Sequence, residues 1–286
     1  MVDHSGEAAG HWQTERVLFS AIQFAAVTDV AVNLSTIDAL VSRAAAEGAE
    51  VTVLPEAAMH DFGAPDLPLG PVAQPLDGEF VTALARLAAR HGITIVAGMF
   101  ERSNDPDRPF NTLVALDPAG EIISSYRKAH LYDSFGYRES DRLLSGPAAP
   151  VTVAIGELTI GLMTCYDLRF PELARALVDD GSDALLVPAA WVRGPLKEAH
   201  WSTLLRARAI ENTVYVVGAA QTGEHYTGCS MIVDPMGVTV AALGDEEGTT
   251  SAAVDPERIA QVRKLNPSLA NRRLDRETSP ARHAGA

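Results

Sequence analysis

Short apolar runs of strand length alternate with stretches whose apolar residues recur every three or four positions. In the first half of the chain, "VLFSAIQF" (17–24), "VTVLPE" (51–56) and "ITIVAGMF" (93–100) have the length and the β-branched content of buried strands. Two intervening segments, residues 33–48 and 80–87, place their apolar side chains on one face of a helix. The first half therefore predicts the order strand, helix, strand, helix, strand.

The same order returns in the second half. A hairpin pattern over residues 111–128 separates the halves, with Asp-Pro-Ala-Gly at its turn. The runs that follow predict two strands, a helix, a strand, a helix, a strand and a further hairpin: residues 151–155, 158–165, 171–179, 184–189, 197–212, 213–220 and 229–254. Two mixed sheets that bury one face against each other and the other beneath helices satisfy this order. We predict an α/β protein with a four-layer α-β-β-α sandwich, two mixed sheets inside and helices outside.

The charge and the cysteine content of the chain indicate which partners and which cellular compartment to expect. The 286 residues carry 23 basic and 37 acidic side chains, and the formal net charge of −14 repels phosphate backbones and anionic lipid. We expect no nucleic-acid partner and no membrane association. Cys165 and Cys229 cannot build a disulfide framework, and neither a secretory leader nor an 18-residue apolar run is present. A cytoplasmic location is therefore expected.

The two ends differ in composition from the centre. Residues 1–15 are polar and rich in Gly and Ala, whereas residues 270–286 mix charge with Pro and Gly. Such segments are typical of tails and of partner-binding arms. We predict a polar N-terminal tail over residues 1–15, a single domain over residues 16–269, and a C-terminal tail or partner-binding arm over residues 270–286.

The segment "GLMTCYDLRFPEL" (161–173) raises the question of a nucleophile. An apolar strand ends at Cys165, and a sharp turn into the next helix would expose the sulfur beside the N–H groups of the following residues. A free thiol is mostly protonated at pH 7, so it needs a neighbouring base or cation. A lone cysteine is more often a packing residue. Cys229 keeps that second interpretation, because it begins an apparent core strand.

Two charged residues follow other predicted strands. Glu56 comes after "VTVLP" with no charged neighbour, a position suited to a general base. Lys128 ends "EIISSYRK", and beside a thiolate it would stabilise both that thiolate and a developing oxyanion. Taken singly, Glu56 is more typical of a residue that caps a helix, and a lysine at a strand end such as Lys128 is usually a solvated side chain. The carboxyl ends of parallel strands are where α/β proteins bind ligands, and Glu56 and Cys165 both lie at such ends.

Three segments together resemble the signature blocks of a known family. "LPE" (54–56), "YRKAHL" (126–131) and "TCYDLRFPEL" (164–173) are similar to those of the nitrilase superfamily, the carbon–nitrogen hydrolases with a Glu-Lys-Cys triad. Residues 200–223 and 227–237 resemble downstream segments of the same family. The resemblance implies the α-β-β-α fold that the apolar pattern also predicts.

The resemblance also implies roles for individual residues. Cys165 would be the nucleophile and Glu56 the general base. Lys128 and the backbone N–H of Tyr166 would stabilise the tetrahedral intermediate. Many members of the family have a second glutamate after the lysine, and Glu139 occupies that place here, eleven residues past Lys128. We expect Glu139 to hold Lys128 or the leaving amine in position.

The nucleophile block and "HWSTLLRARAIEN" are most similar to the Nit-type ω-amidases and deaminated glutathione amidases. This similarity implies hydrolysis of a small, linear, carboxylate-bearing amide, with release of ammonia through a thioester. Arg169 is the candidate cation for the substrate carboxylate, with Arg138 and Arg193 as alternatives. Arg169 can equally form a structural ion pair with a neighbour such as Glu172.

Other activities stay open. An N-carbamoyl amide hydrolase and an aliphatic amidase fit the same residues, whereas a true nitrilase fits less well because its nucleophile block contains tryptophan. A catalytically inactive scaffold subunit is an alternative of another class. The presence of a thiol, an acid and a cation at Cys165, Glu56 and Lys128 argues against a scaffold, because a scaffold needs none of them.

Few further ligands or partners are expected. Trp191 and His60 are candidate substrate-binding residues, although Trp191 can equally be a packed aromatic and a lone histidine such as His60 is more often solvated or packed. The eight histidines show no metal-ligand spacing and the glycines form no phosphate-binding motif, so we predict neither a metal nor a cofactor. Members of the family pair around the helix after the nucleophile, here residues 171–179. The partners we expect are a small amide, water and further copies of the chain, in a homodimer or larger assembly.

Overall fold

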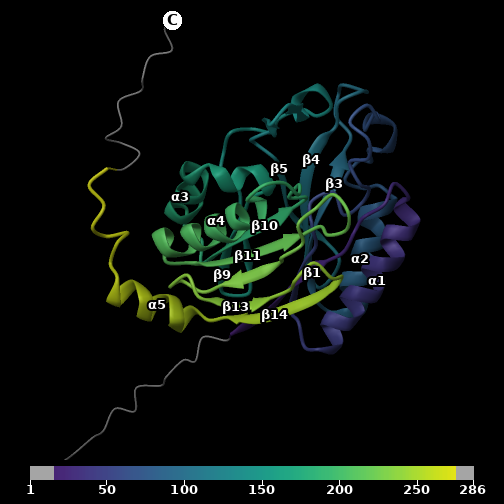
Figure 1. Ribbon diagram of the computed structural model, residues 1–286. Coiled ribbons are helices and arrows are strands. Elements are labelled where there is room, and N and C mark those ends of the chain that lie inside the picture. Colours follow the sequence, from purple (N-terminus) through teal and green to yellow (C-terminus); the bar gives the residue numbers. More distant parts are fainter. Residues whose placement is uncertain (1–15, 275–286) are drawn as a thin grey trace, which may run out of the picture.

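Two six-stranded sheets face each other at the centre of the computed structural model, which describes residues 16–274 (Figure 1). The first sheet has the order β14-β1-β2-β3-β4-β5, and the second has the order β13-β12-β11-β10-β9-β8. The strands of the first sheet are β1 (Val17–Gln23), β2 (Val51–Val53), β3 (Thr94–Glu101), β4 (Phe110–Leu116), β5 (Ile122–Arg127) and β14 (Gly248–Val254). Those of the second are β8 (Thr152–Ile155), β9 (Leu158–Leu162), β10 (Ala184–Ala189), β11 (Tyr215–Ala220), β12 (Met231–Val233) and β13 (Thr239–Ala242).

Helices cover the outer faces of the two sheets. In Figure 1, α1 and α2 lie beside the first sheet, and α3 and α4 lie on the far side of the second. The helices are α1 (Val30–Ala46), α2 (Glu79–His91), α3 (Pro171–Asp179), α4 (Lys197–Asn212) and α5 (Pro256–Leu265). The four layers follow the order helix, sheet, sheet, helix. The predicted α-β-β-α sandwich is therefore confirmed.

The alternation of side chains along the strands divides the apolar core. On β1, Phe19 and Ala21 join a cluster that spans both sheets, whereas Ile22 joins the cluster beneath α1 and α2. On β3, Val96 belongs to the first cluster and its neighbour Ile95 to the second. Successive strand residues point to opposite faces, so central strands such as β3, β10 and β11 are buried on both sides. That burial explains why the strands consist of nearly continuous apolar runs.

The two halves of the chain have similar topologies and are interlocked. Parallel pairs β1-β2-β3 and β9-β10-β11 form the centre of each sheet, and antiparallel strands flank them. The predicted second hairpin exists as β12-β13. The last strand, β14, leaves that hairpin and pairs with β1 in the first sheet, from Val17↔Val254 to Gln23↔Gly248. The end of the chain therefore joins the two halves.

The helix predictions agree closely with the structure, while some strands are shorter than predicted. α3 and α4 have the predicted bounds, and α1 begins earlier because the Asp29 carboxylate accepts from the N–H groups of its first turn. β2 ends at Val53 and β9 at Leu162, before the residues predicted to end them. The prediction that Cys229 begins a core strand is wrong, because β12 begins at Met231 and Cys229 lies half-buried before it.

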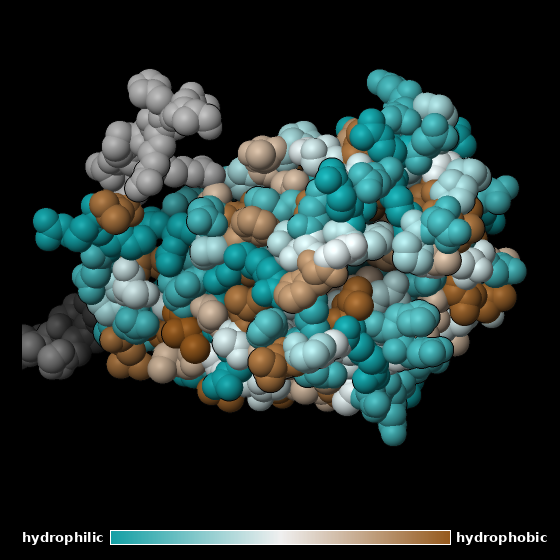
Figure 2. All heavy atoms as spheres, turned by 45° about the horizontal axis from the view of Figure 1, so that its top comes forward, coloured by the Kyte–Doolittle hydropathy of each residue, from teal (hydrophilic) through white to brown (hydrophobic). Residues whose placement is uncertain are grey.

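The predicted N-terminal tail, residues 1–15, lies outside the described residues, as does the part of the predicted C-terminal arm after residue 274. Within the described part of that arm, Arg272 forms an ion pair with Asp179 of α3 at 2.6 Å. No helix within residues 16–274 is long and apolar enough to cross a bilayer. On the face shown in Figure 2, hydrophilic residues cover most of the surface and hydrophobic residues lie in small separate groups.

Candidate active site

Three ionisable side chains meet inside the molecule. Lys128 Nζ donates to Glu56 Oε1 at 2.9 Å and to the two carboxylate oxygens of Glu139 at 3.0 and 2.9 Å. Each of the three side chains is at most 2% exposed. Buried charges are tolerated only when they are paired and hydrogen-bonded, and here the ammonium has a carboxylate oxygen for each of its three protons. The structure thus brings together three residues that the sequence analysis selected.

These residues come from the ends of separate elements. Glu56 lies three residues after β2, Lys128 directly follows β5, and Glu139 begins a short 3-10 turn behind the small hairpin of β6 (Asp133–Ser134) and β7 (Tyr137–Arg138). Asn111 of β4 connects them, because its Nδ2 donates to Glu56 Oε1 at 2.7 Å and to Glu139 Oε1 at 3.4 Å. The Asn111 carbonyl also accepts from the Lys128 N–H at 2.8 Å. Strand β4 therefore fixes the spacing within the cluster.

Glu56 is tied to the second sheet as well. Its Oε2 accepts from the N–H of Ala190, the residue after β10, at 2.6 Å. Its carbonyl oxygen accepts from Gln221 Nε2, one residue after β11, at 2.9 Å. Because both oxygens of the carboxylate are held, its orientation is fixed from two sheets at once.

A glycine lets the strand approach this segment. A Cβ placed on Gly98 of β3 would lie 2.8 Å from Glu56 Cα and 2.7 Å from Ala57 N. Real Cβ atoms do not approach backbone atoms so closely, so no larger residue fits without displacing the chain. Gly98 is thus the residue on β3 that allows Glu56 to turn into the site.

Cys165 occupies a strained turn between β9 and α3. It has φ of +47° and begins a 3-10 helix, Cys165–Arg169, that leads into α3. Non-glycine residues with positive φ are uncommon and mark places where the surrounding structure enforces the backbone shape. Asp167 enforces it here: its carboxylate accepts from the Thr164 N–H at 2.9 Å and from the Tyr126 hydroxyl at 2.7 Å. The predicted sharp strand-to-helix turn is therefore present.

Electrostatics keep the Cys165 thiol neutral. Burial and the charge of Glu56 raise the pKa of this thiol well above its ordinary value, although the charge of Lys128 opposes them. Burial lowers the pKa of the Lys128 ammonium, but the charges of Glu139 and Glu56 outweigh it and hold this pKa well above the usual value. A lysine ammonium beside the thiol is therefore not sufficient to generate a thiolate, and a base has to take the proton.

Tyr166 directly follows Cys165 in the turn. No hydrogen bond joins its backbone N–H to another residue within the range 16–274. Its ring packs edge-on against Tyr132 and Phe170, with centroids 5.0 and 5.3 Å apart. A free N–H beside the sulfur is the feature that an oxyanion hole requires.

The three candidate arginines differ in their partners. Arg138 pairs with Asp141, and Arg193 approaches Asp245 at 3.8 Å. Arg169 forms no ion pair with Glu172 or with any other described carboxylate; its guanidinium lies over the Trp191 ring, 5.0 Å from the centroid. The buried Nε of Arg169 has no hydrogen-bond partner among the described residues. Of the three, Arg169 is the one with a buried donor that has no partner among the described residues, while its Nη2 contacts His200 Nδ1 at 3.4 Å.

The remaining candidates lie at different distances from the cluster. Trp191 is 3% exposed and directly follows Ala190, whose N–H donates to Glu56, while its own ring packs against Trp201 and lies beneath the Arg169 guanidinium. His60 is also buried, but its contacts are with the Asp61 carbonyl and the Phe100 ring, and it makes no hydrogen bond or ion pair to the cluster. Trp191 is therefore linked to the cluster through its neighbour Ala190, whereas no hydrogen bond or ion pair among the described residues links His60 to it.

Several supporting residues escaped the sequence analysis. Asn111 is a polar residue in the apolar run "NTLVAL", which is a recognisable signal of a buried polar role. The Tyr132 N–H donates to Glu139 Oε2 at 2.5 Å, and the Asp167 carboxylate also accepts from His130 Nδ1 at 2.7 Å. A main-chain donor such as that of Tyr132 leaves no mark in a sequence.

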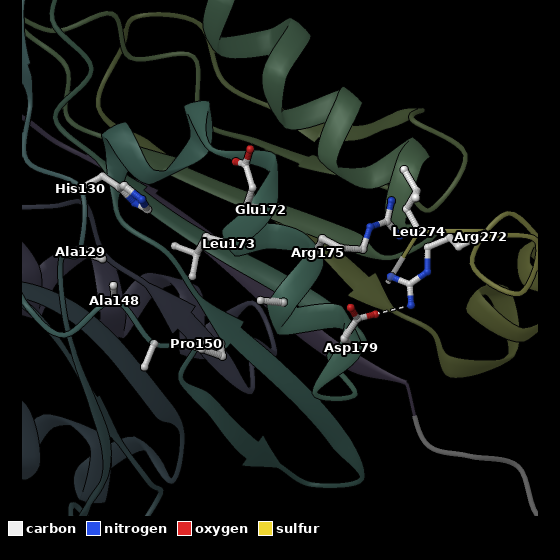
Figure 3. A pocket seen from close by; sticks show the side chains of 12 residues that line it. Ala129, His130, Ala148, Pro150, Glu172, Leu173, Arg175, Asp179, Arg272 and Leu274 are labelled. Atoms are coloured by element: carbon white, nitrogen blue, oxygen red, sulfur yellow. Dashed lines mark ion pairs between the residues drawn. The ribbon is translucent and has the colours of Figure 1, made fainter. Parts of the chain in front are cut away.

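A cavity of about 440 Å³ lies against α3, and none of Glu56, Lys128, Glu139 and Cys165 is among its lining residues; Figure 3 shows the side chains that line it. Its lining is mostly apolar or aliphatic and also includes the ion pair between Asp179 and Arg272 that Figure 3 shows. The cavity reaches the site only at Ala129 and His130, the two residues after Lys128. Within residues 16–274, no group of three or more His, Cys, Asp or Glu side chains is placed to hold a metal ion.

The fold and these sequence blocks define the class of the protein. The chain belongs to the carbon-nitrogen hydrolase family, whose sequence profile matches residues 18–264. It is similar to the deaminated glutathione amidase of Escherichia coli O157:H7, with 44% identity over 259 residues that cover 90% of this chain and 98% of that protein.

Solved structures of the nitrilase superfamily share the fold. Saccharomyces cerevisiae Nit3 superposes with a TM-score of 0.81 at 28% identity, covering 92% of this chain and 98% of that one. An amidase from Nesterenkonia sp. has a TM-score of 0.76 at 26% identity, covering 87% of this chain and 95% of that one. The resemblance to the nitrilase superfamily is therefore confirmed.

Proposed function

We propose that the protein hydrolyses the C–N bond of a small, linear, carboxylate-bearing amide, with Cys165 as the nucleophile. The observation that carries this proposal is the buried cluster in which Lys128 bridges Glu56 and Glu139, close enough to Cys165 on its strained turn for Glu56 and Lys128 to shift the pKa of the thiol. Membership of the carbon-nitrogen hydrolase family supports the reaction type. Water is the second reactant, and no metal or cofactor takes part in the proposed steps.

In the first half of the reaction, Glu56 takes the proton of the Cys165 thiol as the sulfur attacks the amide carbonyl. The raised pKa of this thiol makes such a base necessary at neutral pH. The Lys128 ammonium and the Tyr166 N–H stabilise the oxyanion. The C–N bond breaks, the proton held by Glu56 passes to the leaving nitrogen, and a thioester and a free amine, ammonia for a primary amide, are formed.

In the second half, water attacks the thioester. Glu56 accepts a proton from this water, the C–S bond breaks, and the Cys165 thiol regains the proton as the acid product leaves. Glu139 keeps Lys128 protonated and aimed at the oxyanion through both halves, because its two carboxylate oxygens accept from the ammonium. Removal of one oxyanion donor typically lowers kcat about 10²–10³-fold, so we expect Lys128 to be nearly as important as Cys165.

The substrate class follows from the charge around the site and from the relatives. The buried Nε of Arg169 has no partner among the described residues, although the chain has a net charge of −14 and therefore many carboxylates. A cation left unpaired in such a chain is suited to bind a substrate carboxylate. Relatives named deaminated glutathione amidase support an ω-amide of this kind. The alternatives are an N-carbamoyl amide hydrolase, an aliphatic amidase and, in another class, an inactive scaffold subunit.

The test is hydrolysis by the purified protein and its Cys165→Ala variant. The panel contains 2-oxoglutaramate, 2-oxosuccinamate, deaminated glutathione, an N-carbamoyl amino acid and a neutral aliphatic amide. Ammonia is measured for the primary amides, the released amino group for deaminated glutathione, and carbon dioxide for the carbamoyl compound. We expect turnover of the carboxylate-bearing ω-amides, lost in Cys165→Ala and retained in Cys229→Ala.

Each other outcome assigns a different function. Carbon dioxide with ammonia from the carbamoyl compound alone would identify an N-carbamoyl amide hydrolase. A preference for the neutral amide would identify an aliphatic amidase. Turnover that survives in Cys165→Ala would overturn the nucleophile, and no turnover of any panel member by folded protein would favour the scaffold alternative.

We also propose that the protein assembles as a homodimer or larger through α3. The cavity against this helix is lined by Leu173 and Ala176 of α3 and by Ala148, Ala149 and Pro150 from the loop before β8. An apolar lining on an outer helix is the kind of surface that a second copy covers.

A further inference from the structure

We infer that Lys197 binds a carboxylate of the substrate, together with the Tyr132 hydroxyl. This assignment rests on the proposed function and adds a specific anion-binding residue to it. Lys197 begins α4 and is only 7% exposed. Its Nζ donates to the Tyr132 hydroxyl at 3.0 Å. None of the described carboxylates lies within ion-pair distance of it.

The surroundings of Lys197 compensate its charge only in part. The ammonium lies over three aromatic rings, 5.0 Å from the Tyr132 centroid, 4.5 Å from Phe135 and 5.7 Å from Trp191. Ring faces attract a cation, but they do not replace an anion for a charge that has lost its water. A buried ammonium with one hydroxyl acceptor has two further protons to donate. An incoming carboxylate would supply both the missing charge and the missing acceptors.

Helix stability does not explain a lysine at this position. The N-terminus of a helix carries partial positive charge, so a cation in the first turn is unfavourable there and an acidic residue is preferred. The residue before it, Leu196, has φ of +61°, a conformation that is strained for leucine. The cation at the helix N-terminus and the strained Leu196 both destabilise the fold locally, yet together they place the Lys197 side chain among these rings. We therefore assign the ammonium a functional role rather than a structural one.

Lys197 is connected to the ion cluster on both sides. On one side, the Tyr132 N–H donates to Glu139, which binds Lys128. On the other, Trp191 donates from Nε1 to the Lys197 carbonyl at 2.9 Å and directly follows Ala190, which donates to Glu56. The ammonium therefore lies at the edge of the proposed reaction centre.

Other unused donors gather around the same ring. The Arg169 guanidinium also lies over Trp191, and its buried Nε has no partner. The Tyr132 hydroxyl accepts from Lys197 and keeps its own proton for an acceptor. Two cations and a hydroxyl without a described carboxylate, in a chain of net charge −14, form a site for an anion.

If Lys197 binds the substrate carboxylate, its removal should weaken the binding of amides that carry a carboxylate and leave the binding of neutral amides nearly unchanged. Glutaramate and pentanamide have the same reacting amide, but only glutaramate carries a carboxylate. Binding of each is measured by calorimetry in the Cys165→Ala background, where no turnover occurs, for the parent and for Lys197→Met and Lys197→Arg. We expect Lys197→Met to raise the Kd of glutaramate 10–100-fold and that of pentanamide less than threefold. Lys197→Arg should restore part of the loss, because it keeps the charge.

Lys264→Met is the matched control, since this lysine lies on α5, away from the cluster. Thermal unfolding of each variant detects a purely structural role, which would weaken the binding of both amides together. Three results would each overturn the assignment: Lys197→Met weakens the binding of both amides equally, it weakens the binding of neither, or the parent does not bind glutaramate at all.

The proposed reaction fails in a different way. If the protein with Cys165 intact hydrolyses neither amide while glutaramate binding still depends on Lys197, the proposed reaction is contradicted and the anion site stands.

Discussion

At the scale of single residues, the buried ion cluster contains one more carboxylate than ammonium. Lys128 neutralises one of the two carboxylates, and the other depends on neutral donors, namely Asn111 Nδ2 and the N–H groups of Tyr132 and Ala190. This balance has an electrostatic cost in the folded protein. Burial raises the pKa of the Glu139 carboxyl, and the charge of Lys128 offsets that effect only in part.

The raised pKa of Glu139 predicts how stability changes with pH. At pH values between the ordinary pKa of 4.5 and the higher pKa in the folded state, Glu139 keeps a proton in the folded protein that it has lost in the unfolded chain. Its contribution to the free energy of unfolding therefore falls as pH rises through this range. Relative to Glu139→Gln, the parent should therefore lose unfolding free energy as pH increases above about 4.5, by about 1.4 kcal/mol for each unit of pKa shift. Urea unfolding of both proteins from pH 4 to pH 8 measures the difference. The exposed Glu121→Gln variant is the control and should show no such pH-dependent difference from the parent. A parent that became more stable than Glu139→Gln as pH rose would contradict the prediction.

Sequence reasoning found the charged residues of the site but not all of their supports. Glu56, Lys128 and Cys165 are visible because each interrupts the pattern at the end of an apolar run and matches a family block. Lys197 begins a polar, amphipathic helix, where a lysine normally faces water. Only the turn at Leu196 and the rings of distant segments show that its ammonium is buried.

At the scale of elements, the site depends on where strands stop. β2 and β9 end earlier than their apolar runs, and the freed residues turn so that Glu56 and Cys165 point into the site instead of continuing the sheet. The apolar pattern predicts that the strands exist, because burial on both faces demands it. It does not predict their last residue, because that is set by hydrogen bonds to Ala190 and Asp167 from other parts of the chain.

Strand β3 provides a test of this dependence. A methyl group at Gly98 would overlap Glu56 Cα and Ala57 N, so Gly98→Ala should move Glu56 away from its partners. We expect kcat to fall at least tenfold and unfolding free energy to fall by about 1–3 kcal/mol. Gly244→Ala is the control, because a Cβ there meets no atom within 4 Å. Full activity in Gly98→Ala would show that the close approach is not required.

At the scale of the whole molecule, the fold brings distant parts of the chain around one thiol. Glu56 and Lys128 come from the first sheet, Cys165 and Ala190 from the second, and residues after β11 bind the backbone of Glu56. Alternating strands and helices predict such a sandwich. They do not predict that β14 crosses into the first sheet, because its apolar pattern suits either sheet edge.

The outer face of α3 shows a polar arrangement that suits a two-fold interface. Glu172 lies exposed with no ion pair to a described residue, and the half-buried Arg175 donates from Nη2 to the Glu211 carbonyl at 2.8 Å and has no ion pair to a described carboxylate. The two residues lie one turn apart on the same helix. In a two-fold symmetric pair, a contact between residue i of one copy and residue j of the other occurs twice. We expect Glu172 of one subunit to meet Arg175 of the second across such an axis.

This arrangement predicts the outcome of a charge exchange. Glu172→Arg and Arg175→Glu should each place like charges together twice in the interface and shift a dimer toward monomer, while the double variant should restore the dimer. Sedimentation velocity at micromolar concentration measures the change. Glu79→Arg is the control, because it reverses an exposed glutamate in the first turn of α2 and carries the same cost to its helix. Reversing one charge of a contact that occurs twice must weaken the dimer, and exchanging both charges must restore it. A dimer that persists in both single variants, or a double variant that remains monomeric, would therefore place the interface elsewhere on the molecule.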